Sequence, residues 1–191
     1  PIHKVTIVPR GRALGLTAQL PVEDKHNYSK KYLLGRLDIL MGGRSAEKLI
    51  FNDTTTGAGN DIEVATDLAK KMVTQWGMSG NVGPLHFKTG SEDVFLGREI
   101  SYGRDYSDKL SSLIDSEVSV FIKNAEKNAD RTLKNNLKSL HDVANALLDN
   151  ETITGKEMKE VIATGALGSK TEEKSGKLDS RERRKSNKES K

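Results

Sequence analysis

The 191-residue sequence contains no cysteine, which excludes disulfides, thiolate metal ligands and cysteine nucleophiles. Aromatic residues make up only 5% of the chain, which argues against a large aromatic-cored β-sandwich. No apolar run approaches the roughly 20 residues that a membrane-spanning helix needs, so we expect the chain itself to be soluble. The 35% hydrophobic and 30% charged residues are typical of a helix-rich domain with a polar extension.

The net charge of +4 is confined to one end of the chain. From Gly165 onward there are nine Lys or Arg against five Asp or Glu, which accounts for the whole excess. The rest of the chain is neutral, so we do not expect nucleic acid as a partner. Residues 165–191 also have too few apolar side chains to offset the entropy of ordering, so we expect a basic disordered tail after a domain at residues 1–164.

The N-terminal segment has the pattern of a small β-ribbon. The chain begins with Pro1 rather than Met, and strand-like alternation starts at once, so we expect a fragment or a processed product. Residues 3–8 and 14–20 are the two predicted strands, and the Pro and Gly between them favour a loop. The fold class that we predict is mainly α, with this ribbon near the N-terminus.

Apolar residues at helical spacing predict two helices after the ribbon. The first should begin after an N-cap at Ser29 and be interrupted at Gly42 and Gly43, by a kink or by a closely packed backbone. The second should end at Gly77, where left-handed geometry costs glycine little. Its apolar face consists of Ile62, Ala65, Leu68, Ala69, Met72, Val73 and Trp76.

The second half of the domain is also predicted to be helical. An αα-hairpin should begin at Ser107 and break near Asn135 and Asn136. Thr154 and Glu157 have the spacing of a capping box, which predicts a last short helix. Residues 81–103 have the Gly content and scattered charges of a surface loop, in which a short strand is possible at residues 85–87.

Common catalytic motifs are absent from the sequence. The four histidines, His3, His26, His86 and His141, are scattered, and no two stand at the i, i+4 spacing that places imidazoles on one helical face. A self-contained zinc site is therefore not expected. The sequence also has no nucleophile elbow, P-loop or dinucleotide fingerprint.

The run TTTGAGNDIEVAT leads into the second helix and places Asp61 in its first turn. There the helix dipole stabilises an anion by about 0.3 to 1 kcal/mol, and Asn60 or Thr56 is a candidate for the cap itself. That role does not explain Gly57 and Gly59, which lack side-chain bulk and let the backbone approach another element. From the residues alone, Asp61 either belongs to the helix start or serves as a ligand.

Several runs occur in a fixed order along the chain: PIHKVTIVPRGRALG, GGRSAEKLIF, TTGAGNDIEVATDLAKKMVTQWGMS, GPLHF and FLGREI. Together they closely resemble the proteolytic domain of FtsH-type, membrane-anchored AAA+ zinc metalloproteases. The resemblance extends from Pro1 to about Ile162 and does not include the tail. It implies an ATP-dependent endopeptidase in which zinc-bound water attacks the peptide bond.

The resemblance also implies a zinc ligand. In the family, zinc is held by the two histidines of a His-Glu-x-x-His helix and by one aspartate of a Gly-Ala-x-Asn-Asp motif, and Asp61 matches that aspartate. The histidine pair and the general-base glutamate precede the motif that matches PIHKVTI, so we expect them upstream of Pro1. One carboxylate cannot form a catalytic zinc site, so this chain should have no catalytic residue of its own and be inactive in isolation.

Two further segments have open roles. Glu47, within GGRSAEKL, is either a solvent-facing carboxylate paired with Lys48 or Arg44, or a group near the metal that orients its ligands. The family pattern places an acidic residue at this point. The stretch that includes Leu14, Gly15, Leu16 and Thr17 is either a strand edge on which an extended substrate pairs, or a ribbon that only covers the helices.

The resemblance implies further properties of the whole protein. These are an AAA+ module that uses ATP, a homo-hexameric chamber, membrane and soluble proteins as substrates, and a location on the cytoplasmic face of a bacterial inner membrane or in an organellar membrane. Neither the ATPase motifs nor the membrane anchor occur in these residues. The alternative hypothesis is a non-catalytic helical interaction module whose RERRK tail segment touches acidic membranes or RNA.

Overall fold

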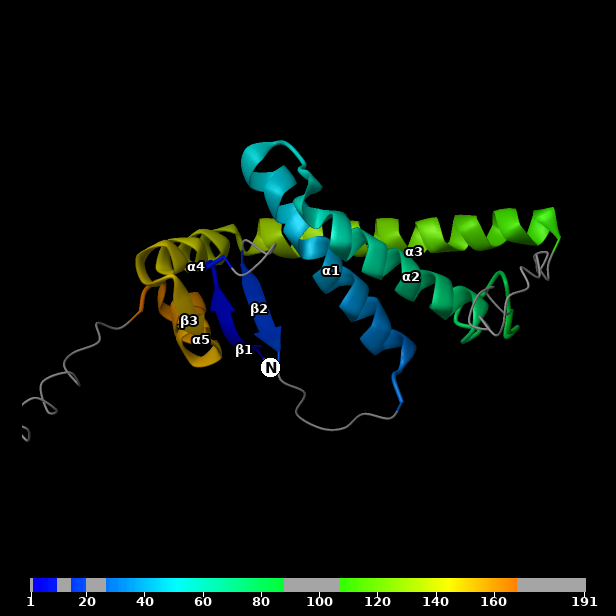
Figure 1. Cartoon of the computed structure of the whole chain (residues 1–191), viewed down its shortest axis with the longest axis horizontal. Helices are drawn as coiled ribbons and strands as arrows, with labels where there is room; N and C mark the ends of the chain where they lie inside the picture. The colour runs from blue at the N-terminus through cyan, green and yellow to red at the C-terminus, as the bar shows by residue number, and fades with distance from the viewer. Residues whose placement is uncertain (1, 10–14, 20–26, 88–106, 168–191) are drawn as a thin grey trace, which may run out of the picture. The chain divides into compact units, whose positions relative to one another are not determined.

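A computed structural model describes residues 2–9, 15–19, 27–87 and 107–167 (Figure 1). The described residues fall into two compact units. We call the first the sheet unit, which contains β1 (Ile2–Thr6), β2 (Leu16–Gln19), α4 (Leu137–Asn150), β3 (Thr152–Thr154) and α5 (Gly155–Thr164). We call the second the three-helix unit, which contains α1 (Lys30–Phe51), the 3₁₀ turn η1 (Thr56–Ala58), α2 (Gly59–Thr74) and α3 (Asp108–Asn135). The predicted mainly α fold is confirmed.

The sheet unit is built on an antiparallel sheet with the strand order β2-β1-β3. The predicted ribbon of β1 and β2 is confirmed, whereas β3 was not predicted because its three residues are too short to show alternation. Thr6 lies opposite Leu16 on one side and Thr152 on the other. The Thr152 hydroxyl donates to the Thr6 hydroxyl at 2.7 Å, and the Ile7 N–H donates to the Glu151 carbonyl at 3.0 Å. These bonds attach the end of β1 to the connection between α4 and β3.

The predicted capping box joins β3 to α5. The Thr154 hydroxyl accepts from the Glu157 N–H, and the Glu157 carboxylate accepts from the Thr154 N–H. At the following residue, Gly155, a Cβ atom would collide with the carbonyl oxygen of Ile2 in β1. A glycine is therefore needed for α5 to begin beside the sheet.

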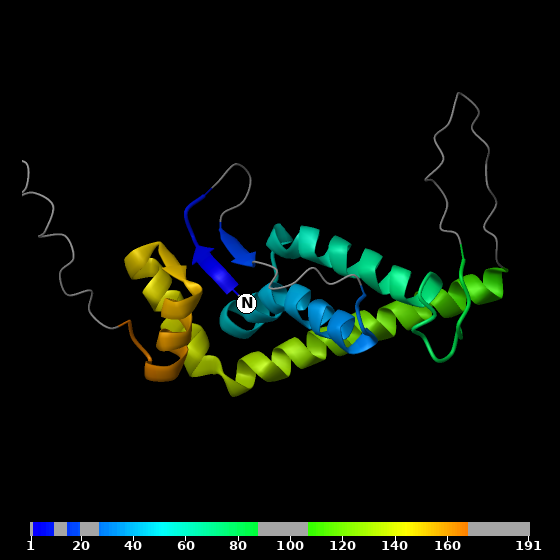
Figure 2. The ribbon, with the colours of Figure 1, turned by 90° about the horizontal axis from the view of Figure 1, so that it is seen from below.

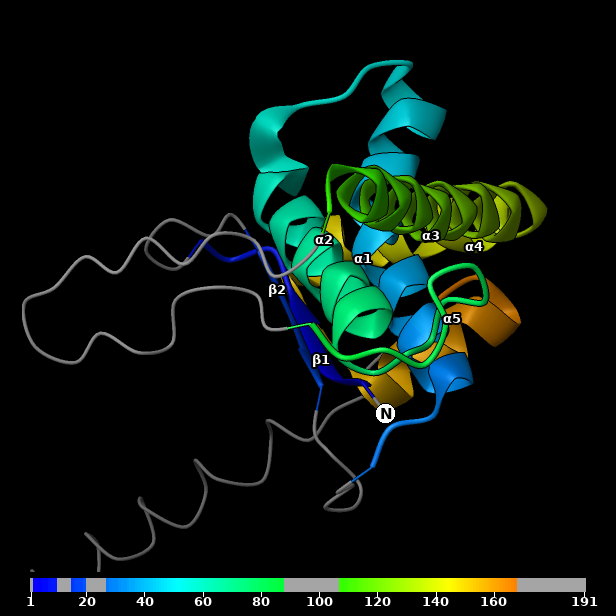
Figure 3. The ribbon, with the colours of Figure 1, turned by 90° about the vertical axis from the view of Figure 1, so that its right-hand side faces the viewer.

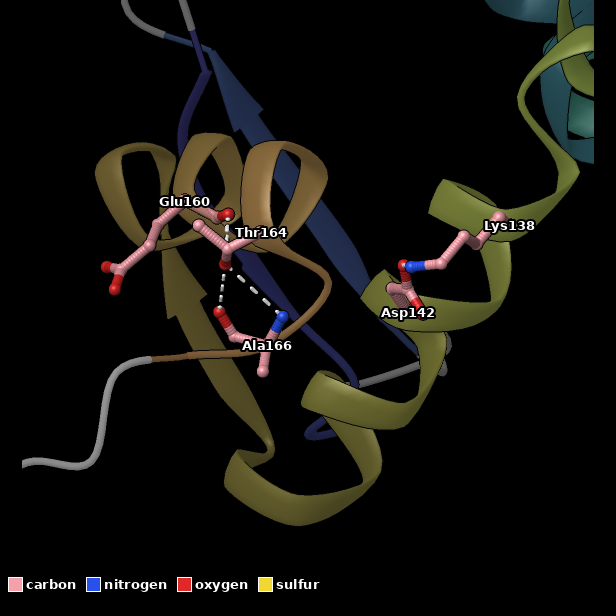
Figure 4. A network of polar contacts seen from close by, with 5 residues as sticks. All are labelled: Lys138, Asp142, Glu160, Thr164 and Ala166. Atoms are coloured by element: carbon pink, nitrogen blue, oxygen red, sulfur yellow. Dashed lines mark hydrogen bonds and ion pairs between the residues drawn. The ribbon is translucent and has the colours of Figure 1, made fainter.

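The C-terminal end of α5 is closed by Gly165. Gly165 has a left-handed φ of 86°, and its N–H donates to the Val161 carbonyl at 2.8 Å. The Thr164 hydroxyl lies 2.8 Å from the carbonyl oxygens of both Glu160 and Ala166 (Figure 4). These contacts fix the chain direction after the helix.

The three-helix unit has the main hydrophobic core. Each of its helices packs against the other two (Figure 2 and Figure 3). Because α1, α2 and α3 each present an apolar stripe, their mutual packing removes the stripes from water. The buried residues of this core are Leu33, Leu37, Leu40, Met41, Ala65, Ala69, Met72, Val73, Val82, Ile114, Val118, Ala125 and Ala129.

Helix α1 starts as predicted but does not break where predicted. The Ser29 hydroxyl caps it by accepting from the Tyr32 N–H at 3.2 Å. The predicted interruption at Gly42 and Gly43 is wrong, because α1 continues through both to Phe51. A Cβ at either glycine would meet no described atom within 4 Å, so neither marks a close backbone contact. Packing of α1 on α2 and α3 outweighs the low helix propensity of two glycines.

Helix α2 ends before Trp76, the last residue of its predicted apolar face. The helix stops at Thr74, and Trp76 lies beyond it with 45% of its surface exposed. Gly77 has the predicted left-handed geometry, with φ 58°, and a Cβ there would lie 2.7 Å from the Cα of Pro84. Residues 85–87 form no strand; the Phe87 N–H instead donates to the Thr74 carbonyl at 2.7 Å. The segment after α2 therefore folds back on the helix end.

Helices α3 and α4 are both present, with the predicted break at Asn136. They fall in different units, so their packing as a hairpin stays a prediction. Residues 168–191 and most of the predicted loop at 81–103 lie outside the described residues, and the domain boundary after residue 164 also stays a prediction. Of the helices that the structure describes, none is long and apolar enough to cross a membrane.

Candidate metal centre

The start of α2 is organised by the turn before it. The Thr55 hydroxyl caps η1 by accepting from the Gly57 N–H at 3.1 Å. Ala58 is the N-cap residue of α2, and no side chain makes a cap hydrogen bond there. The predicted caps, Asn60 and Thr56, are therefore wrong: Asn60 lies within α2 and Thr56 within η1.

Asp61 lies in the first turn of α2, as predicted, and is partly exposed. Among the residues that the structure describes, its carboxylate has no side-chain hydrogen bond or ion pair. The N-terminal end of the helix stabilises this charge, and nothing in the described residues neutralises it. As far as the described residues are concerned, the carboxylate is open to a ligand outside the helix.

Glu47 binds the loop that leads to Asp61. Its two carboxylate oxygens accept from the Thr55 N–H and the Thr55 hydroxyl, each at 3.0 Å. The same hydroxyl accepts from the Gly57 N–H, so a chain of hydrogen bonds joins the end of α1 to η1. A carboxylate that accepts two hydrogen bonds from one residue fixes the position of that residue.

The ion pair offered as the alternative for Glu47 does not form. Arg44 and Lys48 extend to α3, where both lie near Glu126, at 3.5 and 3.8 Å, and Lys48 also lies 3.7 Å from Asp130. Each of these partly exposed pairs contributes little stability. Because both cations are directed to α3, the Glu47 carboxylate binds the loop instead.

The two glycines before Asp61 have different surroundings. A Cβ at Gly57 would lie 3.2 Å from the Thr55 hydroxyl oxygen and 3.4 Å from the Glu47 carboxylate, which is a tight fit. At Gly59, a Cβ would meet no described atom within 4 Å. The predicted close approach therefore occurs at Gly57 and is made to Glu47.

The described residues do not fit a zinc site by themselves. No three His, Asp or Glu side chains lie together as a metal would require in the part of the chain that is described. His3 and His141 are exposed, His86 places its Nδ1 3.2 Å from the Gln75 carbonyl, and His26 lies outside the described residues. A catalytic zinc needs three protein ligands, so the Asp61 carboxylate alone would not form such a site.

The predicted substrate edge corresponds to β2. Leu14 lies outside the described residues, whereas Gly15, Leu16 and Thr17 are all exposed. The strand pairs with β1 along one edge, and no described strand pairs with its other edge. A Cβ at Gly15 would lie 2.9 Å from the Thr6 carbonyl oxygen, so the glycine lets β2 approach β1 closely. The substrate role of this edge stays a prediction.

The sequence reasoning missed the role of Thr55. In the run TTTGAG any of three threonines is a candidate cap, and no spacing connects one of them to a glutamate at the end of the preceding helix. It also missed Glu117, which is 9% exposed and lies among the apolar residues of α3. The position of this carboxylate within an apolar stripe of the sequence could have predicted a buried hydrogen-bonded group.

Glu117 holds the segment after α2. Its carboxylate accepts from the Ser79 hydroxyl and the Asn81 amide, each at 2.7 Å. The Ser79 hydroxyl oxygen also accepts from the Val82 N–H at 3.1 Å. The hydrogen bonds from Asn81 and Ser79 lower the pKa of Glu117 and outweigh the opposing effect of burial; the charge of Lys30 also lowers it.

Comparison with known proteins decides the family. Residues 1–161 match Peptidase family M41. The chain belongs to this family. It is 46% identical over 165 residues to the ATP-dependent zinc metalloprotease FtsH of Pelodictyon phaeoclathratiforme, covering 86% of this chain and 25% of that protein. It is 49% identical over 162 residues to FtsH 1 of Thermoanaerobacter sp. strain X514, covering 85% and 26%.

A third M41 relative gives the same picture. The FtsH protein of Magnetococcus marinus is 49% identical over 163 residues, which cover 85% of this chain and 24% of that protein. The resemblance to FtsH-type zinc metalloproteases is thus confirmed. The chain spans about a quarter of the length of these curated relatives.

Proposed function

We propose that this chain is part of an ATP-dependent zinc metalloendopeptidase and that it contributes the aspartate ligand, Asp61. The observation that carries the proposal is the Asp61 carboxylate, which has no side-chain hydrogen bond or ion pair with any described residue and follows a loop braced by Glu47 through Thr55 and Gly57. A metal ligand must be held in a defined direction without being consumed by other contacts, and this arrangement meets both conditions. The M41 relatives are themselves named as ATP-dependent zinc metalloproteases.

The number of zinc ligands in the 191 residues limits the activity that the chain can have by itself. They contain no His-Glu-x-x-His sequence, so they supply neither the histidine pair nor the general-base glutamate of the family's zinc site. One carboxylate gives zinc neither enough donors nor a fixed geometry. We therefore propose that the isolated chain is inactive, and that it acts together with a segment that carries that motif.

The substrates that fit this proposal are unfolded membrane and soluble proteins. An extended polypeptide would pair with the stretch Leu14, Gly15, Leu16 and Thr17, the last two of which lie on the outer edge of β2, where backbone groups supply affinity with little sequence selection. The remaining properties proposed for the whole protein are an AAA+ module, a homo-hexamer and a location at a membrane.

Zinc titration of the isolated chain tests the ligand count. We expect weak, non-stoichiometric binding by calorimetry, because a single carboxylate is available. A tight one-to-one site would show that the chain has further ligands and that the count is wrong.

Substitution of Asp61 tests its role in the protein that combines this chain with a His-Glu-x-x-His segment. Asp61→Asn should lower the bound zinc, measured by elemental analysis, and reduce peptide hydrolysis to background. Asp67→Asn, an exposed residue of the same helix, is the matched control and should leave both unchanged. Full zinc occupancy in the Asp61→Asn protein would contradict the proposal.

A further inference from the structure

A groove between α1 and α3 combines an apolar floor with a cationic rim. Its volume is about 570 Å³, which is large enough for several side chains. The floor is formed by Leu34, Phe121 and Ala125, and the rim includes Lys30, Lys127 and Arg131. All six belong to α1 or α3 of the three-helix unit, whereas Asp61 belongs to α2.

The charges of α3 are divided between two sides of the helix. Glu126 and Asp130 are paired with cations of α1. Lys127 and Arg131 stand four residues apart, and neither forms an ion pair with any acidic residue that the structure describes. Like charges at this spacing repel one another and destabilise a helix, so an incoming anion would relieve the repulsion.

The acidic group of the groove is already engaged by an amide. Asn128 donates to the Asp38 carboxylate at 3.4 Å, and Arg131 donates to the Asn128 side-chain oxygen at 3.2 Å. Asp38 offsets one of the three positive charges of Lys30, Lys127 and Arg131, so the groove keeps a net charge of +2. Lys30 lies 5.7 Å from the centre of the Phe121 ring, which places a cation above the apolar floor.

We propose that this groove binds an acidic peptide segment of a partner protein, with carboxylates on the rim and an apolar side chain on the floor. A small inorganic anion would leave the floor unused. A lipid surface is flat and would not reach the apolar floor of the groove. The tail of this chain, with nine Lys or Arg and five Asp or Glu, has the wrong charge to occupy it.

Fluorescence anisotropy with a labelled peptide of alternating Glu and Leu tests the proposal on the full 191-residue chain. Lys127→Glu should weaken binding about tenfold, since a rim contact is reversed in sign. Lys123→Glu is the matched control: it lies four residues earlier on the exposed surface of α3 and does not line the groove. It should change the affinity less than twofold, because Lys123 does not line the groove and would make no direct contact with a peptide bound there.

The control peptides and surfaces separate the alternatives. A peptide with Gln in place of Glu should bind at least tenfold more weakly. Any contribution of the basic tail to peptide binding is the same in every variant, because none of the substitutions changes the tail. Equal weakening by Lys123→Glu and Lys127→Glu would show a diffuse charge effect and overturn the proposal. Binding to phosphatidylserine vesicles that is lost in Lys127→Glu, with no peptide binding, would also overturn it, in favour of a membrane surface. Matching far-UV circular dichroism confirms that each variant is folded.

Discussion

At the scale of single residues, Glu47 determines the geometry of a loop that lies eight residues later in the sequence. Its carboxylate accepts both hydrogen-bond donors of Thr55. Because these bonds are exposed, they contribute modestly to global stability. Their main effect is local, since they define where η1 and then α2 begin.

Glu47→Gln should lower the free energy of unfolding by about 1 kcal/mol, because the amide places a donor opposite a donor of Thr55. Hydrogen exchange of the Thr55 and Gly57 amides should accelerate more than exchange in the core of α3. Glu63→Gln, an exposed residue of α2, is the matched control. Unchanged exchange at Thr55 would contradict a bracing role for Glu47.

Glu117 makes the stability of the three-helix unit depend on pH. Its pKa is lowered in the folded state, mainly by the hydrogen bonds from Asn81 and Ser79. The ionised form therefore stabilises the fold at pH values above the ordinary glutamate pKa of about 4.3, and this stabilisation is lost as the pH falls through the lower folded value.

Glu117→Gln should destabilise the protein by about 2 kcal/mol at pH 7 in urea unfolding, with a smaller difference at pH 3. Below the ordinary glutamate pKa the unfolded chain takes up a proton at this position, so the stabilisation by the ionised carboxylate decreases. Asp115→Asn, on an exposed position of α3, should show little difference at either pH. An equal loss at both pH values would show that shape rather than charge is responsible.

At the scale of elements, glycines that look alike in the sequence have opposite effects. Gly43 lies within α1, with no described atom near its missing Cβ. Gly77 has a left-handed φ of 58° and would place a Cβ 2.7 Å from Pro84. The first glycine only weakens its helix, whereas the second permits the chain to turn after α2.

Gly43→Ala should therefore raise the free energy of unfolding by about 0.5 to 1 kcal/mol, and Gly77→Ala should lower it by more than about 1 kcal/mol. Thermal unfolding of the 191-residue chain followed by circular dichroism measures both. Destabilisation by Gly43→Ala would show that α1 contacts a surface at that position.

Elements with a strong local signal were predictable from the sequence. Ser29 and the Thr154–Glu157 box began helices as expected, and Gly77 has the expected left-handed geometry although α2 ends earlier, at Thr74; each acts through its own backbone neighbours. The continuity of α1 through Gly42 and the third strand depend on packing partners far away in the sequence. Asp61 was placed in the correct turn, but its brace by Glu47 and Thr55 required the fold.

At the scale of the whole chain, the amino-acid composition changes near the C-terminal end of α5. The last described contacts at the C-terminus close α5 and involve Gly165 and Ala166. The sequence beyond Leu167 has little apolar content to bury, so it should add little to stability.

Deletion of residues 168–191 should leave the melting midpoint unchanged. A deletion that begins at Gly165 should lower it, because the helix cap and the contacts of Thr164 are lost. Differential scanning calorimetry of the two truncated chains measures the contrast. Equal midpoints for both truncations would show that the cap contributes nothing.

The hydrogen bonds among Glu47, Thr55 and Gly57 also restrict how the sequence can change over time. The three residues contact one another, so a substitution at one position removes hydrogen bonds or space that the other two require. No single second substitution would restore these contacts. Their mutational effects should be non-additive, and accepted changes should occur together. Variants engineered with a new loop at this point would need a new residue at the end of α1 as well.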